Sequence, residues 1–565
     1  MLVNKTTAML MMKKMMLATA ALAFLMPLLS CANDEVSIGK DSDKQENPRP
    51  QSYTVTGRVT CAGKPLAGVA VSDGVDVVVT DAAGEYRLSS SKEFGYVFVS
   101  TPGGYGVATD GNRPQFFRRL SSLKTNEVET ADFELRKEDN EKHAVFTLAD
   151  AHLAARNNDV QEFRKAAADI NATVRNLRGQ GYKVYGISLG DESWDVYWQT
   201  NHYNIMDARD EMNVIEAPLY HNMGNHDGNP YVAGDRKSEQ SFIDACGPTY
   251  YSFNLGKVHY VVLDNIEYLN DGAKEGVLGK RNYHEKIVDT QMKWLRKDLA
   301  LIKDNATPIV IAMHSPVYRH PQLLNGEQTL VYLMSNGSEL ESLLSRFDNV
   351  HTLSGHLHTS HNIQSTPNIF EHNTPAISAT WWWTDKLVGK SVCLDGSPGG
   401  YGVYRWDGTT ADWYYKGLFL DESCQFRAYD LNTTYINPQS YAPDYVEDMT
   451  RYAHEYATPR HDNRVLINVW NYDSAWKVEV FEDNKPLAVT RVMAYDPMHI
   501  IAYDAPRIKA GGAAKVSFAT IQTSHMFTAQ AARSNSTLRI KVTDRFGRVY
   551  TEDMVRPKAF GIDMK

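Results

Sequence analysis

The sequence predicts a multidomain protein with a central α/β domain between two β domains. In the middle of the chain, short apolar runs alternate with segments whose apolar residues recur at helical spacing, a pattern typical of a sheet covered by helices. The flanking regions instead alternate apolar and polar residues between Gly, Pro and Asn turns, which indicates β-structure. With 565 residues, 43% of them hydrophobic, the chain can fill several cores, and its size predicts about three domains.

The N-terminal segment predicts export and membrane anchoring. Lys13 and Lys14 precede an apolar stretch, 15–29, that is too short to span a bilayer, so residues 1–30 are predicted to be a signal peptide. The sequence Leu-Leu-Ser-Cys at 28–31 resembles a bacterial lipobox, which implies cleavage before Cys31 and acylation of its thiol. Residues 31–51 are polar and lack periodicity, as in a flexible tether. We therefore expect an exported bacterial lipoprotein, anchored to a membrane and facing the periplasm or the cell surface.

Residues 52–138 are predicted to form a β-sandwich. Alternating segments at 53–59, 68–72 and 85–88 are separated by Gly, Pro and Asp turns. This pattern resembles transthyretin-like or carboxypeptidase-regulatory-like β-sandwiches.

Residues 139–372 are predicted to form the α/β domain. Its expected strands are rich in Val, Ile, Phe and Tyr and cover 143–148, 183–189, 308–313 and 349–353. Helical periodicity falls at 160–178 and 287–303. Each strand stops at a polar functional group, and in open α/β sheets ligands bind outside the carboxyl ends of the strands. We therefore expect a binding site at this edge.

Residues 373–565 are predicted to form a C-terminal β domain. Strand alternation returns at 465–470, 476–481, 513–519 and 538–542. Neither flanking β domain contains a nucleophile triad, a Walker-type loop or a Cys-rich metal motif. We assign both to positioning, substrate framing or surface association.

Side chains that ligate metals follow the central strands. They are two carboxylates, one carboxamide and four imidazoles: Asp150, His152, Asp191, Asn225, His314, His356 and His358. Asp150 and His152 are two residues apart, so at an extended strand end they point to the same side and can chelate one ion. The same spacing lets His356 and His358 straddle two ions about 3.5–4 Å apart. Asp191 is the candidate bridge, since a carboxylate has two oxygens. Mixed O and N ligation suits Mn, Fe, Zn, Ni or Co, among which the sequence does not choose.

The ordered motifs D-x-H, GD, GNHD, H and GHxH resemble those of the calcineurin-like metallophosphoesterase superfamily. The resemblance implies a four-layer sandwich and the hydrolysis of a phosphate mono- or diester by a metal-bridging hydroxide. It implies that the first metal is held by Asp150, His152, Asp191 and His358. It implies that the second is held by Asp191, Asn225, His314 and His356. His226 would steady the transition state and protonate the leaving oxygen, a role that suits imidazole because it titrates near neutral pH.

Asp195 departs from the pattern of the superfamily. Many members carry an aspartate three residues after the bridging one, where it orients the catalytic histidine, but here that position is Trp194 and the aspartate follows it. Asp195 either takes the orienting role or faces solvent.

Other residues near the motifs have two interpretations each. Arg319 is a candidate for bidentate contact with a substrate phosphate, or it lies on a solvated loop. The run 381–383 of three tryptophans is a stacking platform or a packing seam between two domains. Four histidines match no ligand position and are interpreted as structural or rim residues: His143, His221, His320 and His351.

Charge and cysteine content limit the expected partners. A net charge of −9 without a long basic tract argues against nonspecific nucleic-acid binding and favours a small phosphorylated substrate. The four cysteines beyond Cys31 are too sparse for a disulfide framework, although Cys393 and Cys424 could pair in an oxidising compartment. The alternative function is a lipoprotein module that binds envelope glycans or phospholipids and carries a vestigial metal site. The complete ligand set argues against that alternative.

Overall fold

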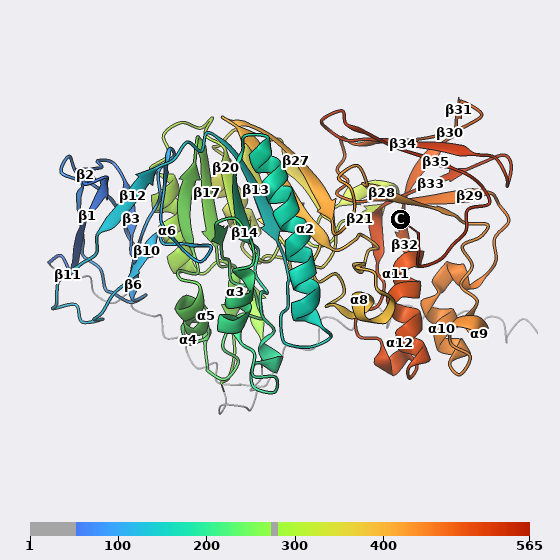
Figure 1. Cartoon of the computed structure of the whole chain (residues 1–565), viewed down its shortest axis with the longest axis horizontal. Helices are drawn as coiled ribbons and strands as arrows, with labels where there is room; N and C mark the ends of the chain where they lie inside the picture. Colours follow the sequence, from blue (N-terminus) through green and yellow to red (C-terminus); the bar gives the residue numbers. More distant parts are fainter. Residues whose placement is uncertain (1–51, 273–280, 565) are drawn as a thin grey trace, which may run out of the picture. The chain divides into compact units, whose positions relative to one another are not determined.

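The computed structural model describes residues 52–272 and 281–564, which belong to one compact unit, 51–565 (Figure 1). The predicted signal peptide, Cys31 and the tether lie outside the described residues. Among the described helices, none combines the length and the apolar character needed to cross a membrane.

The N-terminal region consists of two small sheets around a shared apolar core. The first sheet contains β1 (Val55–Cys61), β2 (Lys64–Pro65), β5 (Glu85–Leu88), β7 (Tyr105–Gly106), β11 (Glu129–Thr130) and β12 (Phe133–Lys137). The second contains β3 (Ala70–Ser72), β4 (Val77–Val79), β6 (Tyr96–Val99) and β10 (Phe117–Arg119). Strands β8 (Thr109–Asp110) and β9 (Arg113–Pro114) form a separate two-stranded hairpin. Val59, Val99 and Phe133 are buried in one apolar cluster, as the alternating pattern predicts for inward-facing residues.

Two larger sheets form the centre of the fold. The five-stranded sheet has the order β15 (Leu219–Tyr220), β14 (Lys183–Ser188), β13 (Lys142–Leu148), β26 (Gly400–Asp407) and β27 (Thr410–Gly417). The six-stranded sheet has the order β16 (Tyr251–Leu255), β17 (Val258–Leu263), β20 (Ile309–Met313), β23 (Val350–Ser354), β25 (Ile369–Asn373) and β24 (His361–Thr366). All four predicted central strands are present, as β13, β14, β20 and β23.

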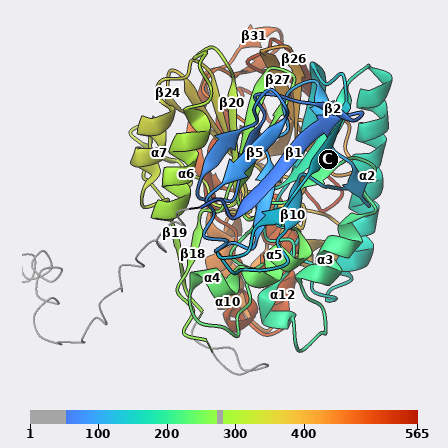
Figure 2. The same ribbon diagram turned by 90° about the vertical axis from the view of Figure 1, so that its left-hand side faces the viewer.

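Helices cover the outer faces of these sheets. The longest, α2 (Asp159–Gly179), packs Phe163 and Val174 against Phe146 of β13, whereas the preceding residue, Val145, belongs to the cluster shared with the six-stranded sheet. This change of face follows from the period of two along a strand. Helices α6 (Asp289–Leu299) and α7 (Gly337–Leu344) lie on the opposite flank from α2 in Figure 2. The central domain is therefore the four-layer α/β sandwich that the superfamily resemblance predicts.

The central sheet extends beyond residue 372, where the sequence prediction ends the α/β domain. Strand β26 pairs antiparallel with β13, from Lys142 opposite Asp407 to Thr147 opposite Gly402, and β27 continues the sheet. The alternation of 400–417 is the same whether the strand joins this sheet or a later one. Only the pairing with a distant strand decides which sheet this segment joins.

The C-terminal region contains two four-stranded sheets. One has the order β28 (Phe426–Asp430), β29 (Arg464–Val469), β33 (Gln522–Gln530) and β32 (Val489–Tyr495). The other has the order β31 (Lys485–Pro486), β30 (Lys477–Glu482), β34 (Leu538–Thr543) and β35 (Val549–Met554). The helical segments of the C-terminal region are α8 (Trp383–Val388), α9 (Pro438–Tyr441), α10 (Val446–Tyr452), η2 (His454–Ala457), α11 (Pro497–His499), η3 (Ile500–Asp504), α12 (Ala505–Lys509) and η4 (Ala513–Lys515).

One predicted C-terminal strand is wrong. Residues 513–519 form a short 3-10 turn, η4, followed by irregular chain, because Val516 packs among helices and Phe518 stacks on Trp381. These tertiary contacts outweigh a local alternation that has no strand partner.

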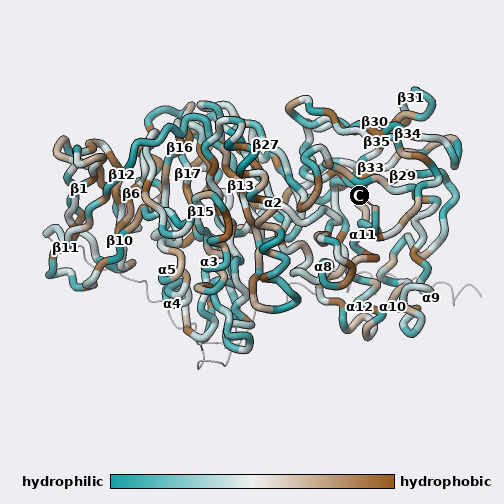
Figure 3. Tube along the Cα trace, in the orientation of Figure 1, coloured by the Kyte–Doolittle hydropathy of each residue, from teal (hydrophilic) through white to brown (hydrophobic). Residues whose placement is uncertain are grey.

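The remaining elements connect the central strands. They are η1 (Asp195–Tyr197), α3 (Ile205–Met212), α4 (Asp235–Ser238), α5 (Gln240–Ala245), β18 (Ile266–Tyr268), β19 (Tyr283–Glu285), β21 (Gln322–Leu324) and β22 (Glu327–Thr329). Figure 3 shows hydrophobic residues along the central strands and hydrophilic residues in many of the loops.

Cys393 and Cys424 do not pair in the structure, and both are free thiols. Cys393 is fully buried, and its Sγ contacts the carbonyl oxygens of Ala376 at 3.7 Å and Pro398 at 3.8 Å. Burial raises the pKa of this thiol well above its usual value. The possible disulfide of the sequence analysis is therefore absent.

Candidate metal centre

The predicted ligands meet at the carboxyl ends of five central strands. Asp150 follows β13, Asp191 follows β14, Asn225 follows β15, His314 follows β20, and the pair at 356 and 358 follows β23. Backbone hydrogen bonds join the first two loops, because the amide of Asp150 donates to the Gly190 carbonyl at 3.1 Å and that of His152 to the Asp191 carbonyl at 2.8 Å. Parallel pairing of β13 with β14, and of β20 with β23, brings the loops of each pair to the same edge of their own sheet, and ligands from the two sheets meet between these edges.

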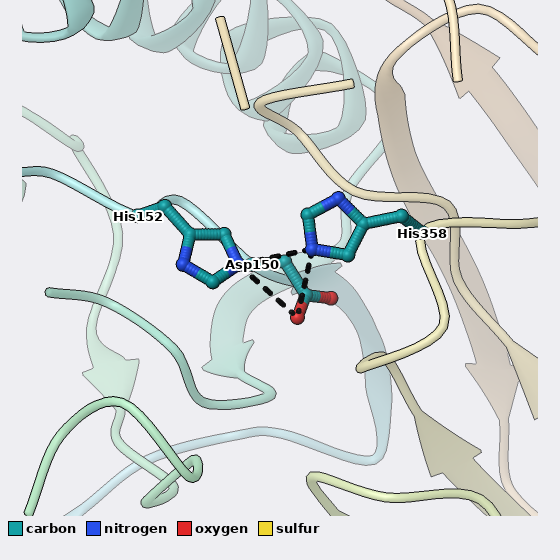
Figure 4. Close-up of side chains that lie close together, drawn as sticks. All are labelled: Asp150, His152 and His358. Carbon is teal, nitrogen blue, oxygen red and sulfur yellow. Dashed lines mark hydrogen bonds and ion pairs between the residues drawn. The ribbon is translucent and has the colours of Figure 1, made fainter. Parts of the chain in front are cut away.

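One ligand group contains Asp150, His152 and His358. Nε2 of His152 lies 2.9 Å from Nε2 of His358, and each Nε2 faces Asp150 Oδ1, at 3.9 Å and 3.6 Å respectively (Figure 4). Nδ1 of His358 donates to the Ala379 carbonyl at 2.9 Å, so its Nε2 carries the lone pair. The group can therefore present two imidazole lone pairs and a carboxylate oxygen to one ion.

The second group contains Asn225, His314 and His356. Nε2 of His314 lies 3.0 Å from Asn225 Oδ1 and 3.1 Å from His356 Nδ1. Asp191 Oδ2 lies 3.4 Å from that same Nε2 and 3.6 Å from His152 Nε2 in the first group. One carboxylate oxygen thus stands between the two groups, the position that the sequence analysis predicts for the bridge.

A pair of cations fits this arrangement. Asp150 Oδ1 is buried and has no hydrogen-bond partner among the described residues, and the two Nε2 atoms lie 2.9 Å apart, so both can direct a lone pair toward one ion. Buried polar atoms are otherwise almost always paired, because leaving one unpaired costs about 1–3 kcal/mol. The donors are imidazole nitrogens and carboxylate or amide oxygens, a set that Mn, Fe, Zn, Ni and Co accept.

The backbone around the ligands is strained. Positive φ angles occur at five predicted ligands: Asp150 (56°), His152 (45°), Asp191 (54°), His356 (70°) and His358 (53°). Left-handed backbone is uncommon for residues other than glycine and costs on the order of 1–3 kcal/mol per residue. Such a concentration of strain is typical of functional sites, where the fold holds side chains in one geometry.

Burial and mutual charge shift the pKa values of the ligand groups. Burial alone would lower the pKa of His314, but the carboxylates of Asp191 and Asp150 raise it to about 9. Burial raises the pKa of Asp150 to about 8, and the nearby Asp191 carboxylate adds to the shift. Burial lowers the pKa of both His152 and His358, which favours the neutral imidazole that metal ligation requires.

His226 lies beside both ligand groups. Its ring is 5.3 Å from that of His152, its backbone amide donates to Asp191 Oδ1 at 2.8 Å, and its side chain is 20% exposed. Nδ1 of His226 lies 2.8 Å from Oδ1 of Asp195, a residue of η1 that is 2% exposed. Asp195 therefore faces the histidine, and the one-residue shift places its carboxylate in contact with the imidazole.

Arg281 completes this contact and was missed by the sequence analysis. Its Nε lies 2.5 Å from Asp195 Oδ2, and its Nη2 lies 2.8 Å from Asp195 Oδ1 and 3.0 Å from His226 Nδ1. A lone arginine between Lys280 and Asn282 matches no motif, so no sequence signal singled it out. Arg319, the predicted substrate contact, is exposed, and its amide donates to the Val331 carbonyl.

The tryptophan run lies where the central and C-terminal regions meet. Trp381 stacks on His358 with ring centroids 3.8 Å apart and on Phe518 at 3.7 Å, so both of its faces are covered. Trp382 is buried and donates to the Ala151 carbonyl at 2.7 Å. Trp383 contacts the Arg507 guanidinium at 4.2 Å. These contacts match the packing-seam interpretation of the run.

Three of the unassigned histidines have structural partners. His143 contacts the Asn140 carbonyl and the Tyr260 hydroxyl at 2.9 Å and 2.8 Å. Nδ1 of His351 lies 3.0 Å from Nε2 of His372, and Nδ1 of His320 lies 3.3 Å from the Thr359 hydroxyl. These contacts hold the three rings within the fold.

Comparison with known proteins agrees with these observations. Three family models match the chain: the N terminal of calcineurin-like phosphoesterase at 53–138, calcineurin-like phosphoesterase at 145–360, and the C terminal of calcineurin-like phosphoesterase at 371–550. No curated protein matches the sequence.

Solved structures with related folds include a dimetal phosphatase from Danio rerio, with 12% identity, a TM-score of 0.34, and coverage of 49% of this chain and 96% of that one. A putative 5'-nucleotidase from Staphylococcus aureus shows 13% identity, a TM-score of 0.33, and coverage of 50% and 55%. These similarities are low, so the assignment rests on the three sequence matches. Because those matches span 53–550 with only short gaps, the chain belongs to the calcineurin-like phosphoesterases, a family of metal-dependent phosphoester hydrolases.

Proposed function

We propose that the protein hydrolyses a small phosphate mono- or diester with two metal ions. The observation that carries the proposal is the position of Asp191 Oδ2, within 3.6 Å of His152 Nε2 and 3.4 Å of His314 Nε2. Two ions held by these groups would supply the Lewis acidity that activates water and neutralises phosphoryl oxygens.

His226 is the proposed general acid. Because its Nδ1 faces Asp195 and Arg281, the proton for the leaving oxygen is carried by Nε2. Asp195 fixes the orientation of the ring, and the bidentate guanidinium of Arg281 fixes Asp195 in turn. This chain of contacts holds the imidazole beside the two ligand groups before substrate arrives.

The experiment that tests the proposal is hydrolysis of p-nitrophenyl phosphate and bis-p-nitrophenyl phosphate by the metal-loaded protein. We expect turnover of at least one ester that a chelator abolishes and that Mn or Zn restores. The preferred ester assigns the substrate class. The proposed hydrolysis would be contradicted if no divalent ion gave turnover and if the metal-free protein bound an envelope glycan. Those results would support a binding module.

Arg281 is expected to matter more than Arg319. Arg281→Gln should lower kcat/KM by about 10–100-fold, because hydrogen bonds between charged groups contribute about 1.5–3 kcal/mol and each 1.36 kcal/mol is tenfold in rate. Arg319→Gln is the matched comparison, since it removes a guanidinium that the structure leaves exposed. An equal or larger loss at Arg319 would instead support the contact predicted from the sequence.

The protein is further proposed to be a lipoprotein anchored through Cys31. The apolar stretch at 15–29 and the Leu-Leu-Ser-Cys motif support this assignment. Expression with a radiolabelled fatty acid should label the wild-type chain and leave Cys31→Ser unlabelled. Equal labelling of the two chains, or none of the wild type, would overturn it.

A further inference from the structure

Besides the two ligand groups of the metal centre, the structure contains a further group of side chains with metal-ligand chemistry. Glu192 follows Asp191 after β14, His221 follows β15, and Cys246 caps the C-terminus of α5. One ligand atom from each lies within 4.8 Å of the others. All three residues are buried, with exposed fractions of 0%, 4% and 5%. The group is therefore preassembled from three separate elements.

Two polar atoms of this group have no hydrogen-bond partner. Nδ1 of His221 lies 2.6 Å from Oε1 of Glu192, but Oε2 of the same carboxylate and Nε2 of the same imidazole are buried and unpaired among the described residues. Buried polar atoms in folded proteins almost always have a hydrogen-bond partner. The occurrence of these two unpaired atoms beside a cysteine indicates that the group binds a ligand.

The donor set of the group suits a cation as the missing partner. Burial raises the pKa of the Cys246 thiol well above its usual value, and the neighbouring carboxylates of Glu192 and Asp227 add to the shift, so without an ion the thiol keeps its proton. A dication would displace that proton, and the resulting thiolate and one carboxylate would neutralise the dication. The nearby guanidinium groups of Arg113 and Arg209 lower the pKa of the thiol, but they donate to the Ala245 carbonyl, at 2.5 Å and 2.9 Å, and leave Glu192 Oε2 without a partner among the described residues.

We propose that Glu192, His221 and Cys246 bind a third metal ion, of the zinc class, in a structural site separate from the two-metal centre. One sulfur, one nitrogen and one oxygen are ligands that zinc accepts, and three protein ligands leave its fourth position for water. A thiolate selects against Mg and Ca, which prefer oxygen.

The position of this site gives it a structural role. Glu192 is joined by a peptide bond to Asp191, and His221 precedes Asn225 by four residues. An ion held there would tie these two ligand loops to α5. The ion would thereby fix the orientation of Asp191 and Asn225 in the two-metal centre, as hydrogen-bond partners of metal ligands do in other proteins.

Cobalt substitution of the full chain tests the proposal. A cobalt ion bound to Cys246 should give a thiolate-to-metal charge-transfer band, and loaded protein should contain about three ions per chain. Cys246→Ser should remove the band and one ion. Cys393→Ser is the matched control, since it also removes a fully buried free thiol but should keep both the band and the third ion.

The third site can be tested independently of the two-metal centre. Asp191→Asn removes the proposed bridge, so this variant should lose hydrolysis but retain the charge-transfer band and one ion. Lack of the band in cobalt-loaded wild-type protein would overturn the third site, even if Cys246→Ser failed to fold. A band that survives Cys246→Ser would also overturn it. Neither result would affect the proposed hydrolysis.

Discussion

Replacing Asp191 by Asn is expected to remove both ions of the two-metal centre together and to lower the rate of hydrolysis by more than about 100-fold. Loss of a residue that only hydrogen-bonds a metal ligand already lowers metal affinity or activity by about 10–100-fold, and loss of a ligand should lower it further. The reason is positional: Asp191 Oδ2 lies between His152 and His314, so it contacts both ligand groups. An amide is neutral and a weak ligand, so neither group retains its full set of donors. Metal content and kcat/KM, measured on the same preparation, check the result.

A terminal ligand provides the sharpest comparison for Asp191. His358→Ala should release the ion of the first group and leave the second, because His358 contacts Asp150 and His152 but no member of the second group in the contacts described. Asp169→Asn controls for the substitution itself, since Asp169 on α2 hydrogen-bonds Tyr401 far along the chain and should change neither measurement. Retention of both ions by Asp191→Asn would exclude the bridging role.

Replacing His226 by Gln is expected to slow hydrolysis by about 10²–10⁴-fold for esters with poor leaving groups. An alkoxide needs a proton as it departs, whereas p-nitrophenolate departs readily without one. The loss should therefore be much smaller for p-nitrophenyl phosphate than for an alkyl phosphate. Comparing kcat for the two esters isolates proton donation from metal binding, which His226→Gln should leave intact.

Asp195→Asn and His284→Gln complete this test. Asp195→Asn should show the same leaving-group dependence with a smaller loss, because Asp195 acts through the His226 ring at 2.8 Å. His284→Gln alters an exposed histidine of β19 and should leave both esters unchanged. An equal loss on both esters for His226→Gln would assign this residue to binding and deny it the role of general acid.

The central fold and the ligand positions were predictable because their signals are local. A buried strand is a run of apolar residues, and a ligand that follows it lies at the sheet edge whatever the rest of the chain does. Parallel pairing then brings Asp150 beside Asp191 in one sheet and His314 beside His356 in the other, and the packing of the two sheets joins these pairs. The order of the motifs was enough to indicate the family, which the three sequence matches confirm.

Other features depended on contacts between distant residues. The sequence by itself determined the central strands, the candidate ligands that come after them and the β character of both flanking regions. Only the tertiary structure decided that β26 joins β13, that Phe518 stacks on Trp381 instead of entering a strand, and that Arg281 meets Asp195. The physical reason is that each of these contacts joins segments far apart in the chain, the nearest pair being separated by 86 residues, and their stability comes from packing and charge pairing that local periodicity does not encode.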